Sequence, residues 1–162
     1  YWYKMMKVME GFSLDKNAIL EYQRNRPPYL MVDYVTEVIP GVSANGYKDL
    51  TDEDWFFKCH FPGDPNMPGM LQIEALVQLC ALTVFTLPGN KGKVVYLSSA
   101  DKLKLKRKIV SGDRLKMKTE LLSWRRGIGK CTGAGTVNGE IACRADFVIA
   151  MPDILEEFQV SS

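Results

Sequence analysis

The longest apolar segment of the chain lies between Pro68 and Thr86 and predicts one buried helix. Its apolar positions occupy nearly all sides of a helical projection: Met70, Leu71, Ile73, Leu76, Val77, Leu79, Leu82, Val84 and Phe85. A helix with this pattern is enclosed by other structure and does not lie on a surface. Three polar residues, Gln72, Glu74 and Gln78, interrupt the run, so we expect a core helix and not a membrane span.

The chain on either side of this helix alternates apolar and polar residues, as β-strands do. Two strands are predicted before the helix, at residues 29–39 and 42–50, with a bend at Asn45-Gly46 as an alternative within the second. Four antiparallel strands are predicted after it, at residues 94–110, 114–124, 127–137 and 140–151. A short helix over residues 14–24, capped by Ser13, comes first. This order predicts an α+β fold in which a curved antiparallel sheet encloses one central helix.

Length and composition fit one domain and exclude several classes of function. The chain has 162 residues, of which 46% are hydrophobic, and a net charge of +2, which is too small to indicate nucleic-acid binding. We place the domain at residues 13–152, with an N-terminal extension or added segment at 1–12 and a C-terminal tail at 153–162. We expect no signal peptide and no membrane insertion. The four cysteines lack metal-site spacing and favour free thiols in a reducing, cytoplasmic setting.

The segment CHFPGDPNMPGML, residues 59–71, holds the only histidine of the chain and leads directly into the predicted helix. Its three prolines and two glycines restrict and turn the backbone, so the segment can hold His60 rigidly. Gly69 lies at the start of the helix, where N–H groups have no internal partner, so a ligand carbonyl can approach its amide. Glu74 is the only acid on this apolar helix, and Gln78 shares its face one turn further on and can orient it.

Together these residues supply an imidazole base, an N–H donor for an enolate oxygen and a carboxylic acid. Burial favours the protonated acid, whereas the helix N-terminus favours the ionised form. Such a set suits removal of a proton beside a carbonyl with loss of a β-hydroxyl group. Residue chemistry alone leaves two structural alternatives open: a histidine satisfied by hydrogen bonds at a turn, and a buried acid paired with an Arg or a backbone N–H.

The same residues closely resemble the signature of the β-hydroxyacyl-acyl-carrier-protein dehydratases, which are hot-dog-fold enzymes. The positions that carry the resemblance are His60-Phe61-Pro62-Gly63, Pro65, Met67-Pro68-Gly69, Leu71, Glu74-Ala75 and Gln78. Weaker similarities at residues 28–33, 101, 106–107, 112–113 and 138–139 extend it over about residues 14–151. The dehydratase-isomerases carry aspartate at the position of Glu74, so in this respect the chain resembles the plain dehydratases.

The resemblance implies a role for each site residue. His60 would take the α-proton or orient the acid, Glu74 would protonate the departing hydroxyl, and the Gly69 amide would bind the thioester carbonyl. Phe61, Met70 and Tyr96 would line or gate an acyl tunnel beside the central helix, with packing as the alternative for Tyr96. Ala81 stands on that helix where the family often has glycine, which narrows the tunnel and leaves the acyl-chain length open.

The resemblance also implies partners. The substrate would arrive on the phosphopantetheine of acyl carrier protein, and no metal or redox cofactor would be needed. The enzyme would be a homodimer with active sites shared between subunits, and trimers of dimers would be a further assembly. The cations Lys102, Lys104, Lys106, Arg107 and Lys108 would dock the acidic carrier protein, or would only keep an edge strand solvated.

Two other functions remain open at this point. Hot-dog folds also host acyl-thioester hydrolases, in which a carboxylate on the central helix directs water at the carbonyl. The chain is alternatively a non-catalytic module that binds an acyl group or a carrier protein.

Overall fold

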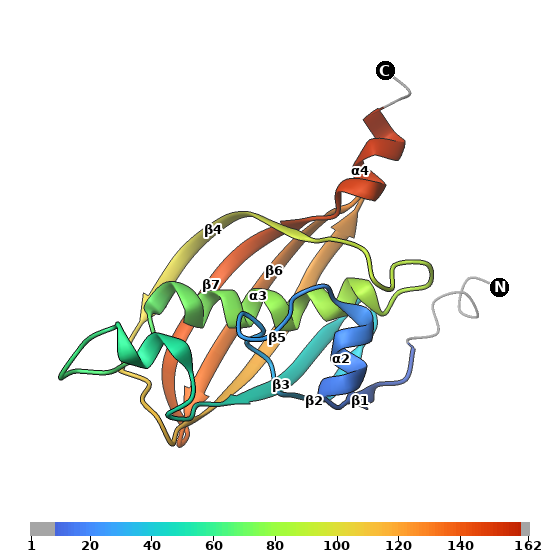
Figure 1. The fold of residues 1–162 in the computed structure, drawn as a ribbon. Helices are drawn as coiled ribbons and strands as arrows, with labels where there is room; N and C mark the ends of the chain where they lie inside the picture. Colours follow the sequence, from blue (N-terminus) through green and yellow to red (C-terminus); the bar gives the residue numbers. More distant parts are fainter. Residues whose placement is uncertain (1–8, 160–162) are drawn as a thin grey trace.

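The computed structural model describes residues 9–159, with side chains up to Glu157, and shows a seven-stranded antiparallel sheet curved around one helix (Figure 1). The strands are β1 (Phe12–Leu14), β2 (Tyr34–Ile39), β3 (Ser43–Asp49), β4 (Tyr96–Leu105), β5 (Arg114–Arg125), β6 (Ile128–Val137) and β7 (Glu140–Ala150). The helices are α2 (Lys16–Tyr22), the 3-10 helix η1 (Trp55–Lys58), α3 (Gly69–Phe85) and α4 (Pro152–Gln159). The strand order is β1-β2-β3-β5-β6-β7-β4, and the predicted α+β fold is confirmed.

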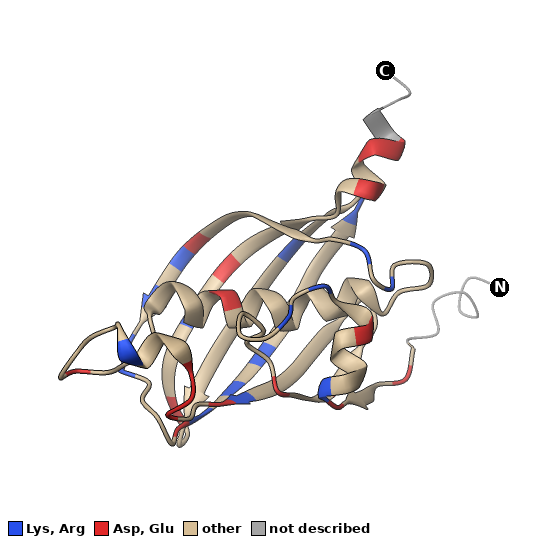
Figure 2. Cartoon of the chain, in the orientation of Figure 1, with Lys and Arg blue, Asp and Glu red and all other residues tan. Residues whose placement is uncertain are grey.

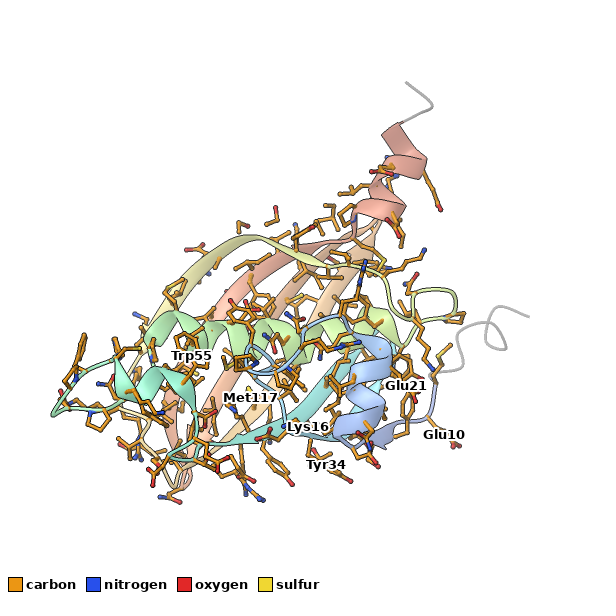
Figure 3. All side chains as sticks on the ribbon, viewed as in Figure 1. Glu10, Lys16, Glu21, Tyr34, Trp55 and Met117 are labelled. Atoms are coloured by element: carbon orange, nitrogen blue, oxygen red, sulfur yellow. The ribbon has the colours of Figure 1, made fainter. Side chains whose placement is uncertain are left out.

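Helix α3 lies in the concave side of the sheet and forms the centre of the core (Figure 1). Every residue from Ala75 to Phe85 is buried, because the helix packs against β3, β5, β6 and β7. Small residues on β6 allow this close approach, and a Cβ added to Gly133 would lie 3.5 Å from the Leu76 Cβ. Met117 of β5 is buried on the same side of the sheet (Figure 3). The predicted enclosure of an all-round apolar helix is thus confirmed.

The segment before β2 departs from the predicted strand because its backbone groups bind a side chain of α3. β2 begins at Tyr34, five residues later than predicted. The Met31 N–H donates to the Gln78 side-chain oxygen (2.7 Å), and the Tyr29 carbonyl accepts from the Gln78 side-chain nitrogen (3.0 Å). These groups therefore support α3 and are not available to a neighbouring strand.

Several local predictions near the N-terminus need correction. Asp15, and not Ser13, caps α2, with its carboxylate accepting from the Ala18 N–H (2.8 Å). Ser13 instead lies in β1, a short strand that the sequence did not predict. Asn45-Gly46 stays within β3 and makes no bend, and glycine is required at 46 because a Cβ there would clash with the Tyr34 carbonyl oxygen.

The structure continues beyond the C-terminal limit of the predicted domain. α4 forms within the predicted C-terminal tail, where the N–H groups of Ile154 and Leu155 both donate to the Met151 carbonyl. It projects away from the sheet (Figure 1). Residues 1–8 of the predicted N-terminal extension and residues 160–162 of the tail lie outside the described residues. Within residues 9–159, no helix is long and apolar enough to cross a membrane.

The burial of α3 predicts where the fold is most sensitive to truncation. Leu76→Ala should lower the free energy of unfolding by about 2–5 kcal/mol, because the Leu76 side chain is fully buried and its loss leaves a cavity. Leu122→Ala is the matched control, since Leu122 is 61% exposed, and it should change the value by less than about 0.5 kcal/mol. Urea unfolding at one fixed protein concentration measures both, and equal losses in the two variants would contradict the expectation.

Candidate active site

The loop after η1 fixes the position and the protonation of His60. Phe56 accepts a hydrogen bond from the His60 N–H (2.9 Å), and the Asn66 N–H donates to the His60 carbonyl (2.9 Å). The ring Nδ1 lies 3.0 Å from the Asn66 carbonyl oxygen. A carbonyl only accepts, so Nδ1 carries a proton, and in the neutral imidazole Nε2 has the lone pair that can accept one. These hydrogen bonds hold His60 in one position, as the turn-rich sequence predicts. Asn66, which orients the ring, is a residue that the sequence did not single out.

Helix α3 and the segment after β4 hold this loop in place. The Met67 N–H donates to the Ile109 carbonyl (2.8 Å), and the buried Gln72 amide donates to the Met67 carbonyl (3.2 Å). On the surface, Lys108 forms an ion pair with Asp64, with Nζ–O distances of 2.8 and 3.0 Å. Gln72, which the sequence showed only as a polar interruption, therefore joins the histidine loop to the central helix.

Glu74 is a half-buried acid held by a buried amide. The Gln78 side-chain nitrogen donates to Glu74 Oε1 (3.0 Å), as the predicted orienting role requires. Burial raises the pKa of Glu74 above its ordinary value, and the hydrogen bond from Gln78 lowers it by a smaller amount. Burial therefore shifts Glu74 toward the protonated form, which can donate a proton. This removes the alternative of an acid paired with an Arg, because no ion pair to Glu74 occurs within residues 9–159.

Tyr29 is a neighbour of this acid that the sequence did not identify. Burial, and secondly the negative charge of Glu74, raise the pKa of the Tyr29 phenol. The backbone carbonyl of the same residue accepts from Gln78. In the sequence, Tyr29 belongs only to the weak family similarity at residues 28–33, and the fold places it near Glu74.

Gly69 is the first residue of α3, and its N–H makes no hydrogen bond within the described part of the chain. The predicted free amide at the helix start is therefore present. The requirement for glycine has a different origin, because a Cβ at this position would clash with the Leu105 side chain at the end of β4.

A cavity of about 330 Å³ lies beside α3. Its lining residues are Arg24, Asn25, Glu74, Val77, Gln78, Ala81, Phe85 and residues 93–97, which include Tyr96. The structure thus brings together Glu74, Gln78 and Tyr96, whereas His60, Gly69, Phe61 and Met70 do not line this cavity. Phe61 and Met70 are 51% and 65% exposed, and the Phe61 ring lies 3.9 Å from the His60 ring, measured between centroids. A single chain therefore places Glu74 at the cavity and His60 outside it.

The predicted cationic stripe on β4 is interrupted. A register shift between Asp101 and Lys104 breaks the alternation, and β4 ends at Leu105, so Lys106 lies beyond the strand. Lys102 and Lys104 are exposed on the strand. Arg107 pairs with Asp113 (3.8 Å) and Glu140 (3.0 Å), and Lys108 pairs with Asp64 as above.

Comparison with known proteins identifies the family of this chain. The model of the FabA-like domain matches residues 24–146. The 3-hydroxyacyl-(acyl-carrier-protein) dehydratase FabZ of Clostridium novyi (strain NT) is 43% identical over 141 residues, which cover 86% of this chain and 98% of that protein. The corresponding protein of Bacillus subtilis (strain 168) is 37% identical over 138 residues, which cover 85% and 98%. The chain therefore belongs to the FabA-like family, and the resemblance noted in its sequence is confirmed.

Solved structures show the same fold. The dehydratase heterocomplex ApeI:P from Xenorhabdus doucetiae superposes with a TM-score of 0.72 at 15% identity, covering 89% of this chain and 97% of that chain. A hypothetical thioesterase protein with coenzyme A from Streptococcus pneumoniae TIGR4 superposes with a TM-score of 0.57 at 14% identity, covering 72% and 83%. At these identities the likeness establishes the fold alone, and the predicted hot-dog fold is confirmed.

The raised pKa of Glu74 predicts a pH-dependent gain of stability on substitution. Between the pKa of an unfolded glutamate, about 4.3, and the higher native value, the folded chain binds more protons than the unfolded chain, so this contribution to stability falls as pH rises. Glu74→Gln removes the ionisable group. The variant should therefore gain stability relative to the native protein as pH increases from 4 to 8.

Thermal unfolding of both proteins across this pH range measures the difference. Glu53→Gln is the control, because it removes an exposed carboxylate by the same substitution. A difference for Glu74→Gln that does not change with pH would contradict a raised pKa for this half-buried acid.

Proposed function

We propose that this chain catalyses the reversible dehydration of a (3R)-hydroxyacyl thioester to the trans-2-enoyl thioester in fatty-acid or related acyl-chain synthesis. The observation that carries the proposal is Glu74, which Gln78 orients and whose pKa is raised, at the cavity beside α3, in a chain whose histidine nitrogen and free helix amide complete the required set. The relatives named 3-hydroxyacyl-(acyl-carrier-protein) dehydratase support the same reaction.

Each residue has a defined part in the reaction. The Nε2 atom of His60 takes the α-proton, and the electron pair moves toward the thioester oxygen, where the Gly69 N–H stabilises the developing charge. Glu74 gives its proton to the β-hydroxyl group, which leaves as water while the double bond forms. Gln78 orients the acid. The water that leaves carries the proton of Glu74, and the proton taken by His60 returns to Glu74 through solvent to complete the cycle. Because the substrate loses only the elements of water, with no net oxidation or reduction, we propose that the reaction uses no metal or redox cofactor.

We infer that the active site is completed by a second copy of the chain. The cavity beside Glu74 holds no His60 from the same chain, and β4 is the edge strand of the sheet. Exposed apolar side chains lie along this edge and near the histidine loop: Phe61, Met70, Tyr96, Leu97 and Leu105. An unpaired apolar edge is a natural site for pairing with another chain. A homodimer would then bring His60 and Gly69 of the partner subunit to Glu74, and assembly into trimers of dimers stays a prediction.

The acyl group is proposed to arrive on the phosphopantetheine of acyl carrier protein. Tyr96 lines the cavity and is 62% exposed, which suits a gate at its mouth. Among the five predicted docking cations, Lys102, Lys104 and Lys106 are exposed and make no side-chain ion pair within residues 9–159. Arg107 and Lys108 are held by acids of the same chain, so we assign docking of the acidic carrier protein chiefly to the three lysines.

A hydration assay distinguishes the proposed function from the alternatives. The purified protein is incubated with a trans-2-enoyl thioester while loss of the conjugated absorbance and appearance of free thiol are followed. Hydration without thiol release is expected, and Glu74→Gln and His60→Ala should each lower the rate by about 10²–10⁴-fold. Thiol release would instead indicate an acyl-thioester hydrolase, and tight binding without either reaction would indicate a binding module.

The shared site predicts rescue when two inactive variants are mixed. Glu74→Gln and His60→Ala chains are unfolded together and refolded, so that mixed dimers form. In a mixed dimer one of the two sites carries both native residues, so random pairing should restore about a quarter of native activity. Each variant refolded alone is the control. A mixture that stays as inactive as its components, although size measurements show dimers, would place both residues of each site on one chain.

A further inference from the structure

The cavity beside Glu74 continues along α3 to Phe85, and its wall is apolar at Val77, Ala81, Phe85 and residues 94–97. From Glu74 the lining passes Val77 and Ala81 before it reaches Phe85. Eleven residues of α-helix separate the two ends, a length of about 16 Å. The phosphopantetheine arm is rich in amides, whereas an acyl tail is a hydrocarbon, so these apolar walls suit the tail. The proposed function places the reacting end of the acyl group at Glu74, so the far end of its tail lies near Phe85.

Two hydrogen bonds bring other segments to this far end. The Gly92 N–H donates to the Tyr22 carbonyl at the end of α2 (2.9 Å), and the Asn90 side-chain amide donates to the Val84 carbonyl on α3 (3.0 Å). Arg24 follows Tyr22 by two residues, and Lys93 follows Gly92 directly. Both line the cavity. In Figure 2 the segment after α2 and the segment that leads into β4 both carry cationic positions.

These two cations have no anionic partner within residues 9–159. No ion pair or side-chain hydrogen bond joins Arg24 or Lys93 to another described residue. Their neighbour Lys91 differs, because it pairs with Glu21 (3.3 Å) and lies over the Tyr22 ring. Among residues 9–159, Glu74 is the only acid that lines the cavity, and it lies eleven positions before Phe85 on α3. The far end of the cavity is therefore a site of uncompensated positive charge.

We propose that Arg24 and Lys93 form an anion subsite at the far end of the acyl cavity, and that the enzyme favours acyl chains whose distal end carries a carboxylate. The proposal rests on the dehydratase function. Arg24 is exposed and Lys93 is half-buried, so a carboxylate at this end keeps part of its water shell while it meets two cations. A chain too short to span the apolar walls does not reach the subsite.

The test compares substrates that differ only at the distal end. Trans-2-enoyl thioesters of N-acetylcysteamine, which contains no phosphate, are prepared in matched lengths with a terminal carboxylate or a terminal primary amide. The quantity measured is the ratio of kcat/KM for the carboxylate over that for the amide. In the double variant Arg24→Gln/Lys93→Met this ratio should fall by about fivefold or more for chains long enough to span the cavity, as expected for partly solvated charge pairs.

Matched controls separate this subsite from general effects. Lys91→Met removes the same charge from the same loop but does not line the cavity, so the ratio should stay at the native value. Raising the salt concentration should lower the native ratio and leave that of the double variant unchanged. A four-carbon enoyl thioester, which cannot reach the two cations, reports on the proposed function separately, and the native protein and Lys91→Met should hydrate it equally.

Two outcomes would overturn the proposal while hydration of the four-carbon substrate persists. One is a carboxylate-to-amide ratio that is the same in the native protein and the double variant at every length. The other is a loss of activity that is equal for all tails and occurs only when the substrate is carried on phosphopantetheine. That second result would assign Arg24 and Lys93 to the phosphate of the arm or to the carrier protein, and not to the acyl tail.

Discussion

The hydrogen bonds of the Gln78 side-chain amide connect the fold of this protein to its chemistry. α3 is buried from Ala75 to Phe85, so a polar side chain on it must find partners inside the structure. Gln78 uses its oxygen for the Met31 N–H and its nitrogen for the Tyr29 carbonyl and for Glu74. The backbone before β2 leaves the sheet ladder to provide these partners. The Gln78 amide thus positions the backbone that leads into β2 and orients the Glu74 carboxyl group.

Glu74 is retained at a position where the fold alone would favour an apolar residue. The residues on either side of it in the chain, Ile73 and Ala75, are buried and apolar, and the partial burial of Glu74 disfavours its ionised form. The same burial shifts the carboxyl group toward the protonated form, as its proposed role as a proton donor requires. A residue that opposes the packing pattern of its own helix is typical of a functional site, where stability is lost for chemistry.

Sequence reasoning succeeded where the signal is periodic and failed where tertiary contacts decide. The limits of α3, β5, β6 and β7 were predicted to within two residues, because long apolar or alternating segments leave few alternatives. β1 and the shortened β2 could not be predicted, since three residues carry no period and the Gln78 contacts are 47 and 49 residues distant in sequence. His60, Gly69 and Glu74 form a local motif, whereas Asn66 acts through its backbone carbonyl, which no side-chain pattern reveals.

The division of the site between the cavity and the exposed histidine loop follows from the topology of the sheet. β4 returns to the sheet at its margin, beside β7, and leaves its other edge and both of its faces largely exposed. The end of this strand also brings Leu105 against Gly69, so the free amide of α3 lies at the same exposed margin. The acid, one and a half turns further along α3, faces the cavity instead. Because one helix presents the amide outward and the acid inward, the proposed second chain, packed along β4, would bring both to one substrate.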